Sequence, residues 1–237
     1  MLAVRPIFSL LTQLAIIAGF RLKRHPKPSQ VAARWWMVSG TLIDLQCLGV
    51  LTWLTRREGI GLADLFNIQR ERLGRDMVLG LGNLVALAPA VGIGTILTRL
   101  FYGSSEQPPQ VAAVHDLPRA ASLYSVLVWP VIWGVTEEAT YIGYVLPRLG
   151  ALMGNTTMSV ALVSVVWALQ HEALPLSLNR RYLAYRPLSA LPITLTMPLL
   201  SLLQERRLLP LIVPHWASNA ASALFAALLR QNARRKA

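Results

Sequence analysis

Cysteine is almost absent from this chain, since Cys47 is the single one among 237 residues. A lone cysteine excludes an intrachain disulfide and a thiolate metal cluster. Charged residues are also scarce at 14%, and acidic residues are the rarer sign, with 11 Asp and Glu against 23 Lys and Arg. Because 54% of the residues are hydrophobic, the composition argues against a water-soluble domain.

Lys and Arg are missing from the middle of the long apolar runs. A bilayer imposes this segregation, and about 20 apolar residues suffice to cross it as a helix. Apolar runs that could span a membrane occupy 35–55, 77–98, 120–147, 149–170 and 208–229, with shorter candidates at 6–20 and 187–204. We therefore predict an all-α fold, a polytopic transmembrane helical bundle with about seven to eight spans.

The first apolar run, 6–20, has the position of a signal peptide. Only Arg5 precedes it as a basic residue, and Gly19-Phe20-Arg21 lacks the small-x-small pattern of a cleavage site. We expect a retained helix.

The basic residues are scattered through short loops instead of forming one stripe. Anionic membrane lipids are therefore the expected counterpart, and nucleic acid is not. By the positive-inside rule, the basic connector 21–34 and the C-terminal tail 230–237 are expected in the cytoplasm, with the protein in the bacterial cytoplasmic membrane. The connector 56–76 is also basic, which conflicts with a simple alternation of sides. Its stretch 61–73 has a helical period and is expected to lie along the interface.

Residues 103–119 contain three prolines and form the connector that looks most like a boundary. We read 1–237 as a single membrane domain. Within it, 1–118 form N-terminal scaffold helices and 119–230 form the catalytic core.

Four acidic residues interrupt apolar runs or touch their ends, namely Asp44, Glu137, Glu138 and Glu172. A charge at mid-membrane costs about 2.5 to 3.5 kcal/mol on insertion scales, so such residues normally line a cavity or pair. Asp44 is alone on its helix and is interpreted as a packing or hydrogen-bonding residue. Glu137 and Glu138 are adjacent carboxyls that repel each other, and such a group can act as a general base for water. Because helical neighbours point about 100° apart, one is expected to face the site and the other a supporting partner.

Two histidines lie one helical turn from a possible partner. Trp167 and His171 share one helix face, and His215 and Asn219 share another. Taken singly, each is typical of a core histidine or of a packing hydrogen bond. The neutral pair of His215 and Asn219 also supplies donors that suit a developing oxyanion. The conjunction of these pairs with two carboxyls, on separate apolar helices, favours a catalytic site.

The three segments TEEATYIGY, WALQH and HWASN resemble the motifs of the CPBP family, which comprises CAAX prenyl proteases and bacteriocin-processing or Abi intramembrane proteases. The resemblance covers roughly 122–228. It implies that Glu137 and His171 activate the attacking water, that His215 and Asn219 bind the oxyanion, and that Glu138 supports the base.

The chain departs from the family pattern at Ile142, which stands where the family usually has Arg, although Gly143 and Tyr144 are similar to its continuation. Arg148 is the candidate substitute for the missing cation. The family is often described as metalloproteases, and Glu137, His171 and His215 are candidate Zn²⁺ ligands with an open position. The same residues can act on water without a metal, and the sequence leaves both readings open.

We first expect an intramembrane endopeptidase that hydrolyses a peptide bond of a membrane-associated or lipidated peptide or protein. The alternative is a catalytically inactive family member, acting as a membrane immunity or scaffold protein or as a proton-coupled carrier. In a third interpretation the polar residues only hold helices together. Substrate identity and oligomeric state do not follow from the sequence.

Overall fold

The computed structural model describes residues 1–236, and it describes their side chains except those of 115–116 and 229–236. Within this part the protein is helical and has no β-strand, which confirms the predicted all-α class. The long helices are α1 (Val4–Leu22), α3 (Trp36–Arg57), α4 (Leu73–Tyr102), α10 (Arg180–Leu203) and α11 (Leu209–Lys236). Shorter helical elements are α2 (Pro28–Arg34), η1 (Leu62–Phe66), η2 (Arg70–Arg72), α5 (Pro109–Ala112), η3 (Ala113–Asp116), α6 (Arg119–Leu127), α7 (Trp129–Glu137), η4 (Glu138–Val145), α8 (Leu146–Met153), α9 (Thr156–Leu169) and η5 (Gln170–Glu172).

Six segments of the described chain are long and apolar enough to cross a membrane. They are α1, α3, α10, the segment Leu62–Tyr102, the segment Arg119–Met153 that joins α6 to α8, and Leu209–Leu228 of α11. The apolar run 149–170, expected as one span, is divided. Helix α8 ends at Gly154, which has φ +61°, and the Asn155 side chain accepts a hydrogen bond from the Met158 N–H to begin the 14-residue helix α9.

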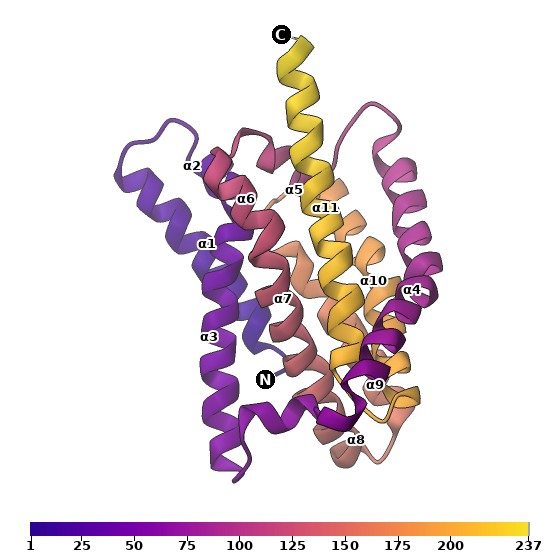
Figure 1. Cartoon of the computed structure of the whole chain (residues 1–237). Helices are drawn as coiled ribbons and strands as arrows, with labels where there is room; N and C mark the ends of the chain where they lie inside the picture. Colours follow the sequence, from indigo (N-terminus) through magenta and orange to yellow (C-terminus); the bar gives the residue numbers. More distant parts are fainter. Residues whose placement is uncertain (237) are drawn as a thin grey trace.

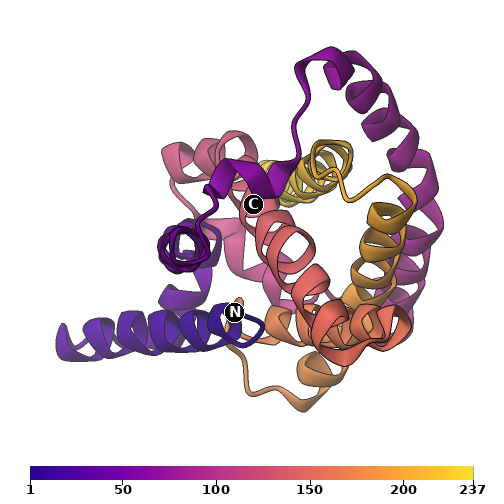
Figure 2. The ribbon, with the colours of Figure 1, turned by 90° about the horizontal axis from the view of Figure 1, so that it is seen from below.

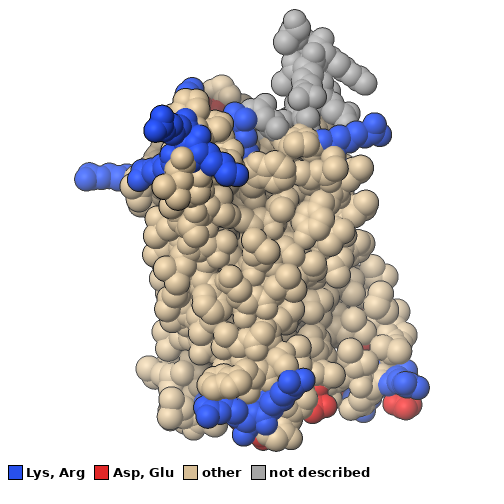
Figure 3. Space-filling model, turned by 90° about the vertical axis from the view of Figure 1, so that its left-hand side faces the viewer, with Lys and Arg blue, Asp and Glu red and all other residues tan. Residues whose placement is uncertain are grey.

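The outer surface has the charge distribution of a membrane protein. Figure 3 shows Lys and Arg gathered at the two ends of the molecule, with a broad band free of charged side chains between them. On the helices of this band, large apolar side chains are exposed instead of buried, for example Leu11 in α1, Leu45 in α3 and Val85 in α4. The chain is a multi-pass membrane protein, because such a surface is stable only against lipid.

Helix α7 lies in the interior of the bundle, in contact with α3 on one side and α11 on another. Helix α10 packs against both α4 and α9. Helix α1 contacts α3 and α2 and leans outward from the bundle, as Figure 2 shows. The chain begins within the bundle, where Met1 and Leu2 pack against the main apolar core. This arrangement brings the start of α1 close to the end of α7.

The two basic connectors lie at opposite ends of the molecule. The loop between α1 and α2 is at the same end as the C-terminal part of α11, whereas η1 and η2 lie at the other end (Figure 1). The apparent conflict between the connectors 21–34 and 56–76 is thus an ordinary alternation with basic residues on both sides. The stretch 61–73 is not one helix, since Asn67 adopts a left-handed conformation with φ 49° between η1 and η2. The side chains of the basic tail 230–237 lie outside the described residues, so the cytoplasmic C-terminus stays a prediction.

Candidate active site

The two adjacent glutamates stand where the backbone changes its helical register. Helix α7 ends at Glu137, and the π-helix η4 begins at Glu138. π-helical turns are rare and are frequent at functional sites. Both glutamates are fully buried. Their side chains point to different partners.

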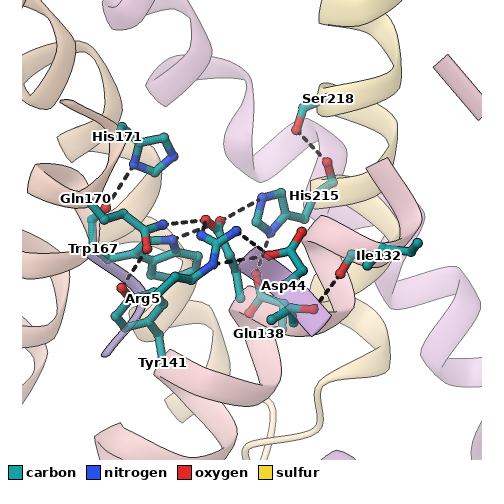
Figure 4. Close-up of polar contacts among 12 residues, drawn as sticks. Arg5, Asp44, Ile132, Glu138, Tyr141, Trp167, Gln170, His171, His215 and Ser218 are labelled. Carbon is teal, nitrogen blue, oxygen red and sulfur yellow. Dashed lines mark hydrogen bonds and ion pairs between the residues drawn. The ribbon is translucent and has the colours of Figure 1, made fainter. Parts of the chain in front are cut away.

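Glu137 is surrounded by side-chain nitrogen atoms from four other helices. The Trp167 Nε1 group donates to Oε2 over 2.9 Å, and His215 Nε2 lies 3.3 Å from the same oxygen. Gln170 Nε2 and Arg5 Nη1 both donate to Oε1. Each carboxylate oxygen therefore has two partners, which makes Glu137 the centre of a polar network. Figure 4 shows the side chains of Arg5, Trp167, Gln170 and His215 in this network.

Glu138 contacts the histidine of the last helix. Its Oε1 lies 2.9 Å from His215 Nδ1, so the two nitrogens of this ring face two different glutamates. Glu138 thus supports His215, whereas the resemblance implied support of the base. One turn further along α11, Asn219 Nδ2 is buried without a hydrogen-bond partner among the described residues.

A proline and a remote asparagine shape the backbone just before His215. Pro214 has no N–H to donate to the carbonyl four residues earlier, that of Pro210. Asn83 Nδ2 of α4 donates to this carbonyl over 2.9 Å. The Asn83 side chain is held in turn by Gln204, through two hydrogen bonds of 3.1 and 2.8 Å. Asn83 therefore satisfies the backbone group that the proline leaves unpaired.

His171 lies at the edge of the network (Figure 4). Its ring centroid is 6.3 Å from that of Trp133. Its Nδ1 is 2.9 Å from the backbone oxygen of Trp167. Because a carbonyl can only accept, Nδ1 carries the proton, and in the neutral form of the ring Nε2 is then an acceptor. Such an orientation suits an imidazole that receives a proton from water.

Three residues of the network were not predicted as site residues from the sequence, namely Gln170, Arg5 and Asp44. Gln170 Oε1 accepts a 2.6 Å hydrogen bond from the Tyr141 hydroxyl, and Gln170 Nε2 donates to Glu137. Arg5 is fully buried, and its Nε and Nη2 donate to Asp44 Oδ1 over 3.2 and 2.6 Å. Asp44, interpreted from the sequence as a packing or hydrogen-bonding residue, thus bonds a neighbouring helix and does so inside the site.

The charged groups form one chain in which acidic and basic side chains alternate. It runs from Asp44 through Arg5, Glu137 and His215 to Glu138. Alternation of this kind lets each buried carboxylate face a donor and avoids direct contact between like charges. Glu172, the remaining acidic residue of the apolar runs, is no member of this chain.

Residues 119–221 match a protein-family model that is described as type II CAAX prenyl endopeptidase Rce1-like. The match supports membership in the CPBP family. At the family level, membership implies a CAAX-type intramembrane protease that acts on a peptide or protein. Searches among curated proteins and among solved structures gave no match.

The CPBP match includes Glu137, Glu138, His171, His215 and Asn219, but it leaves out the helices that carry Arg5 and Asp44. Ile142, at the position where the resemblance leads us to expect Arg, is fully buried among apolar side chains. The suggestion that Arg148 substitutes for this cation is wrong. Arg148 forms an ion pair with Glu58 and bonds the Tyr144 carbonyl. The cation beside the glutamates comes from Arg5.

The CPBP residues do not form a preassembled metal site in the described part of the chain, where no group of three or more His, Cys, Asp or Glu is arranged to hold a metal ion. The donor chemistry agrees, since a guanidinium and two N–H groups already occupy the oxygens of Glu137. A cation would have to displace these donors, so no step is assigned to a metal here.

Proposed function

We propose that this protein is an intramembrane endopeptidase in which Glu137 and His171 activate water and His215 and Asn219 bind the oxyanion. The substrate would be a membrane-associated or lipidated peptide or protein. The observation that carries this proposal is the meeting of Glu137 with the α9 and α11 motif helices, next to the buried, unpartnered Asn219 Nδ2.

The water needs a position on Glu137, whose oxygens are all in contact with donors. The contact of His215 Nε2 with Oε2, at 3.3 Å, is longer than that of Trp167 Nε1, at 2.9 Å. We infer that the water enters here, between Glu137 and His215. The imidazole then becomes available, together with Asn219, to donate to the substrate carbonyl oxygen.

In the reaction, a water proton passes to Glu137 while the water oxygen attacks the peptide carbonyl carbon. Negative charge develops on the carbonyl oxygen and is bound by His215 and Asn219. When the C–N bond breaks, the proton is delivered to the leaving amine. His171, which presents Nε2 as an acceptor, assists in removing the proton from water.

The main alternative, an inactive family member, was motivated by the missing cation at Ile142. Arg5 supplies a cation at Glu137, which supports an active enzyme. A role limited to helix packing explains the unpartnered amide of Asn219 less well, because a buried donor without a partner destabilises a structure.

The test uses the full-length protein in proteoliposomes with an internally quenched, farnesylated CAAX peptide as the probe. Glu137→Gln and His171→Ala are each expected to lower kcat at least about 100-fold, because general acid–base catalysis contributes this much or more. Glu58→Gln is the matched control, since Glu58 also pairs with an arginine but lies at the far end of the molecule. Wild-type cleavage by a folded Glu137→Gln variant would rule out the proposal.

A further inference from the structure

We propose that Arg5, held in place by Asp44, is a positioning residue for Glu137, so that α1 and α3 complete an active site whose motifs lie elsewhere in the chain. This inference rests on the proposed function. It assigns a role to residues outside the segment 119–221 that matches the protease family.

The first argument is the geometry of the Arg5 guanidinium. Its Nε and Nη2 bind Asp44, and its Nη1 binds Glu137, so one planar group spans two carboxylates on two helices. The Trp133 ring lies 4.1 Å below it and fixes the plane of the fork. Arg is suited to this task because its donors are rigidly arranged, whereas the Lys ammonium is a compact point charge.

The second argument is the unusual face by which α1 docks. Its buried residues are Arg5, Ser9 and Gln13, which are spaced by four and form a polar stripe. Gln13 Nε2 donates to Ser39 Oγ of α3 over 2.8 Å. The opposite face is apolar and exposed, including Ile7 and Leu11. The polar contacts of Arg5 and Gln13, together with the packing of Val4 and Phe8 on the apolar core, hold α1 where Arg5 reaches Glu137.

The third argument concerns what Glu137 loses without Arg5. Its Oε1 would keep only the bond from Gln170, and its neighbours Asp44 and Glu138 would no longer be balanced by a cation. A carboxylate in this situation is free to rotate away from the water it must activate. Misplacement of a catalytic group by about 1 Å can cost about 100-fold in rate. The loss should appear in kcat, because Arg5 bonds the protein's own carboxylates and not the substrate.

The chain offers a matched control in a second buried ion pair, Arg207 with Asp76. Both arginines are buried and each contacts an aspartate of another helix. The contacts of Arg207 include no residue of the proposed site. Loss of either arginine should therefore lower stability in a similar way, and only loss of Arg5 should change catalysis of the folded protein.

The experiment measures kcat and KM with the same farnesylated peptide for Arg5→Ala, Arg5→Lys, Asp44→Asn and Arg207→Ala, each corrected for the folded fraction seen by gel filtration. Arg5→Ala is expected to lower kcat about 100-fold with little change in KM. Arg5→Lys should fall between this variant and the wild type, since it keeps the charge but not the fork. Asp44→Asn, which leaves the Arg5–Glu137 contact in place, should show a smaller loss of kcat, and Arg207→Ala should show none. If Arg5→Ala does not fold, Arg5→Lys and Asp44→Asn carry the test.

Two results would overturn the inference while leaving the protease proposal intact, provided that Glu137→Gln is inactive. One is a normal kcat for the folded Arg5 and Asp44 variants, which would make the ion pair structural only. The other is a raised kcat, which would make α1 an inhibitory element. Full activity of Glu137→Gln would instead remove the proposed function, and the role of Arg5 with it.

Discussion

The two buried Arg–Asp pairs of this protein use the same chemistry in different settings. Arg207 binds Asp76 through Nη1 and donates through Nε to the backbone oxygen of Gln204, so its contacts end in a loop between α10 and α11. Arg5 binds Asp44 in a similar way but continues to Glu137 and, through it, to His215. The first pair closes a junction between helices. The second carries an ionic network into the place where the motif residues meet.

Burial and ion pairing alone therefore do not identify a functional site. Both aspartates even leave one oxygen, Oδ2, buried and without a hydrogen-bond partner among the described residues. The Arg5 region differs because Arg5 also contacts Glu137, which in turn contacts His215, and because Asn219 Nδ2 nearby on α11 has no hydrogen-bond partner among the described residues.

The largest difference between the two ion pairs is expected when both members of each pair are replaced by apolar residues and stability and peptide cleavage are compared. Arg207→Met alone should lower the free energy of unfolding by about 3 to 5 kcal/mol, because it leaves Asp76 as an unpaired buried charge. Adding Asp76→Leu should restore most of this stability. The double change Arg5→Met with Asp44→Leu should restore stability likewise, but not peptide cleavage. Thermal unfolding in detergent and the peptide assay measure the two properties; equal cleavage by both double variants would erase the distinction.

A smaller effect is expected from the two buried amides, one in each region. Asn83→Ala should cost about 1 to 3 kcal/mol of stability, because the Pro210 carbonyl loses its donor. Gln170→Leu removes a donor to Glu137, and we expect it to lower kcat more than it lowers the unfolding temperature. Measuring both properties for both variants tests this. A normal kcat for Gln170→Leu would show that Gln170, like Asn83, contributes to stability and not to catalysis.

The smallest effect belongs to the exposed pair of Glu58 and Arg148 at the molecular end. Hydrogen bonds from Arg148 and then from Tyr144 hold the pKa of the Glu58 carboxyl below its ordinary range. A lowered folded-state pKa stabilises the fold above the unfolded-state pKa, and this contribution is lost as the pH falls through the folded-state value. Glu58→Gln should thus be less stable than wild type near neutral pH, by no more than about 1 kcal/mol, and equally stable in acid. Unfolding curves at several pH values measure this; a difference that persists in acid would contradict the assignment.

Much of the fold could be predicted because membrane-spanning helices are long apolar runs in the sequence. The division at Gly154 and Asn155 was missed, since the run stays apolar on both sides of these two residues. The π-helix after Glu137 could not be predicted, because its register depends on how η4 packs and not on local composition.

The motif residues were found from one-turn spacings within single helices, and the structure places them on helices that meet. Arg5 lies 132 positions before Glu137, so no local pattern connects the two. A signal was nevertheless present, in the spacing of Arg5, Ser9 and Gln13 along one face of an otherwise apolar helix. Gln170 escaped because an uncharged amide beside a histidine carries little information by itself.

The position of Arg5 has a consequence for how the protein is made. Synthesis proceeds from the N-terminus, so α1 emerges before α3 with Asp44, and Glu137 follows only 132 positions after Arg5. The Arg5 side chain can pair with Asp44 as soon as α3 has been inserted, whereas its contact with Glu137 has to wait for α7. The polar contacts that complete the site are therefore made only after α7 has joined α1 and α3.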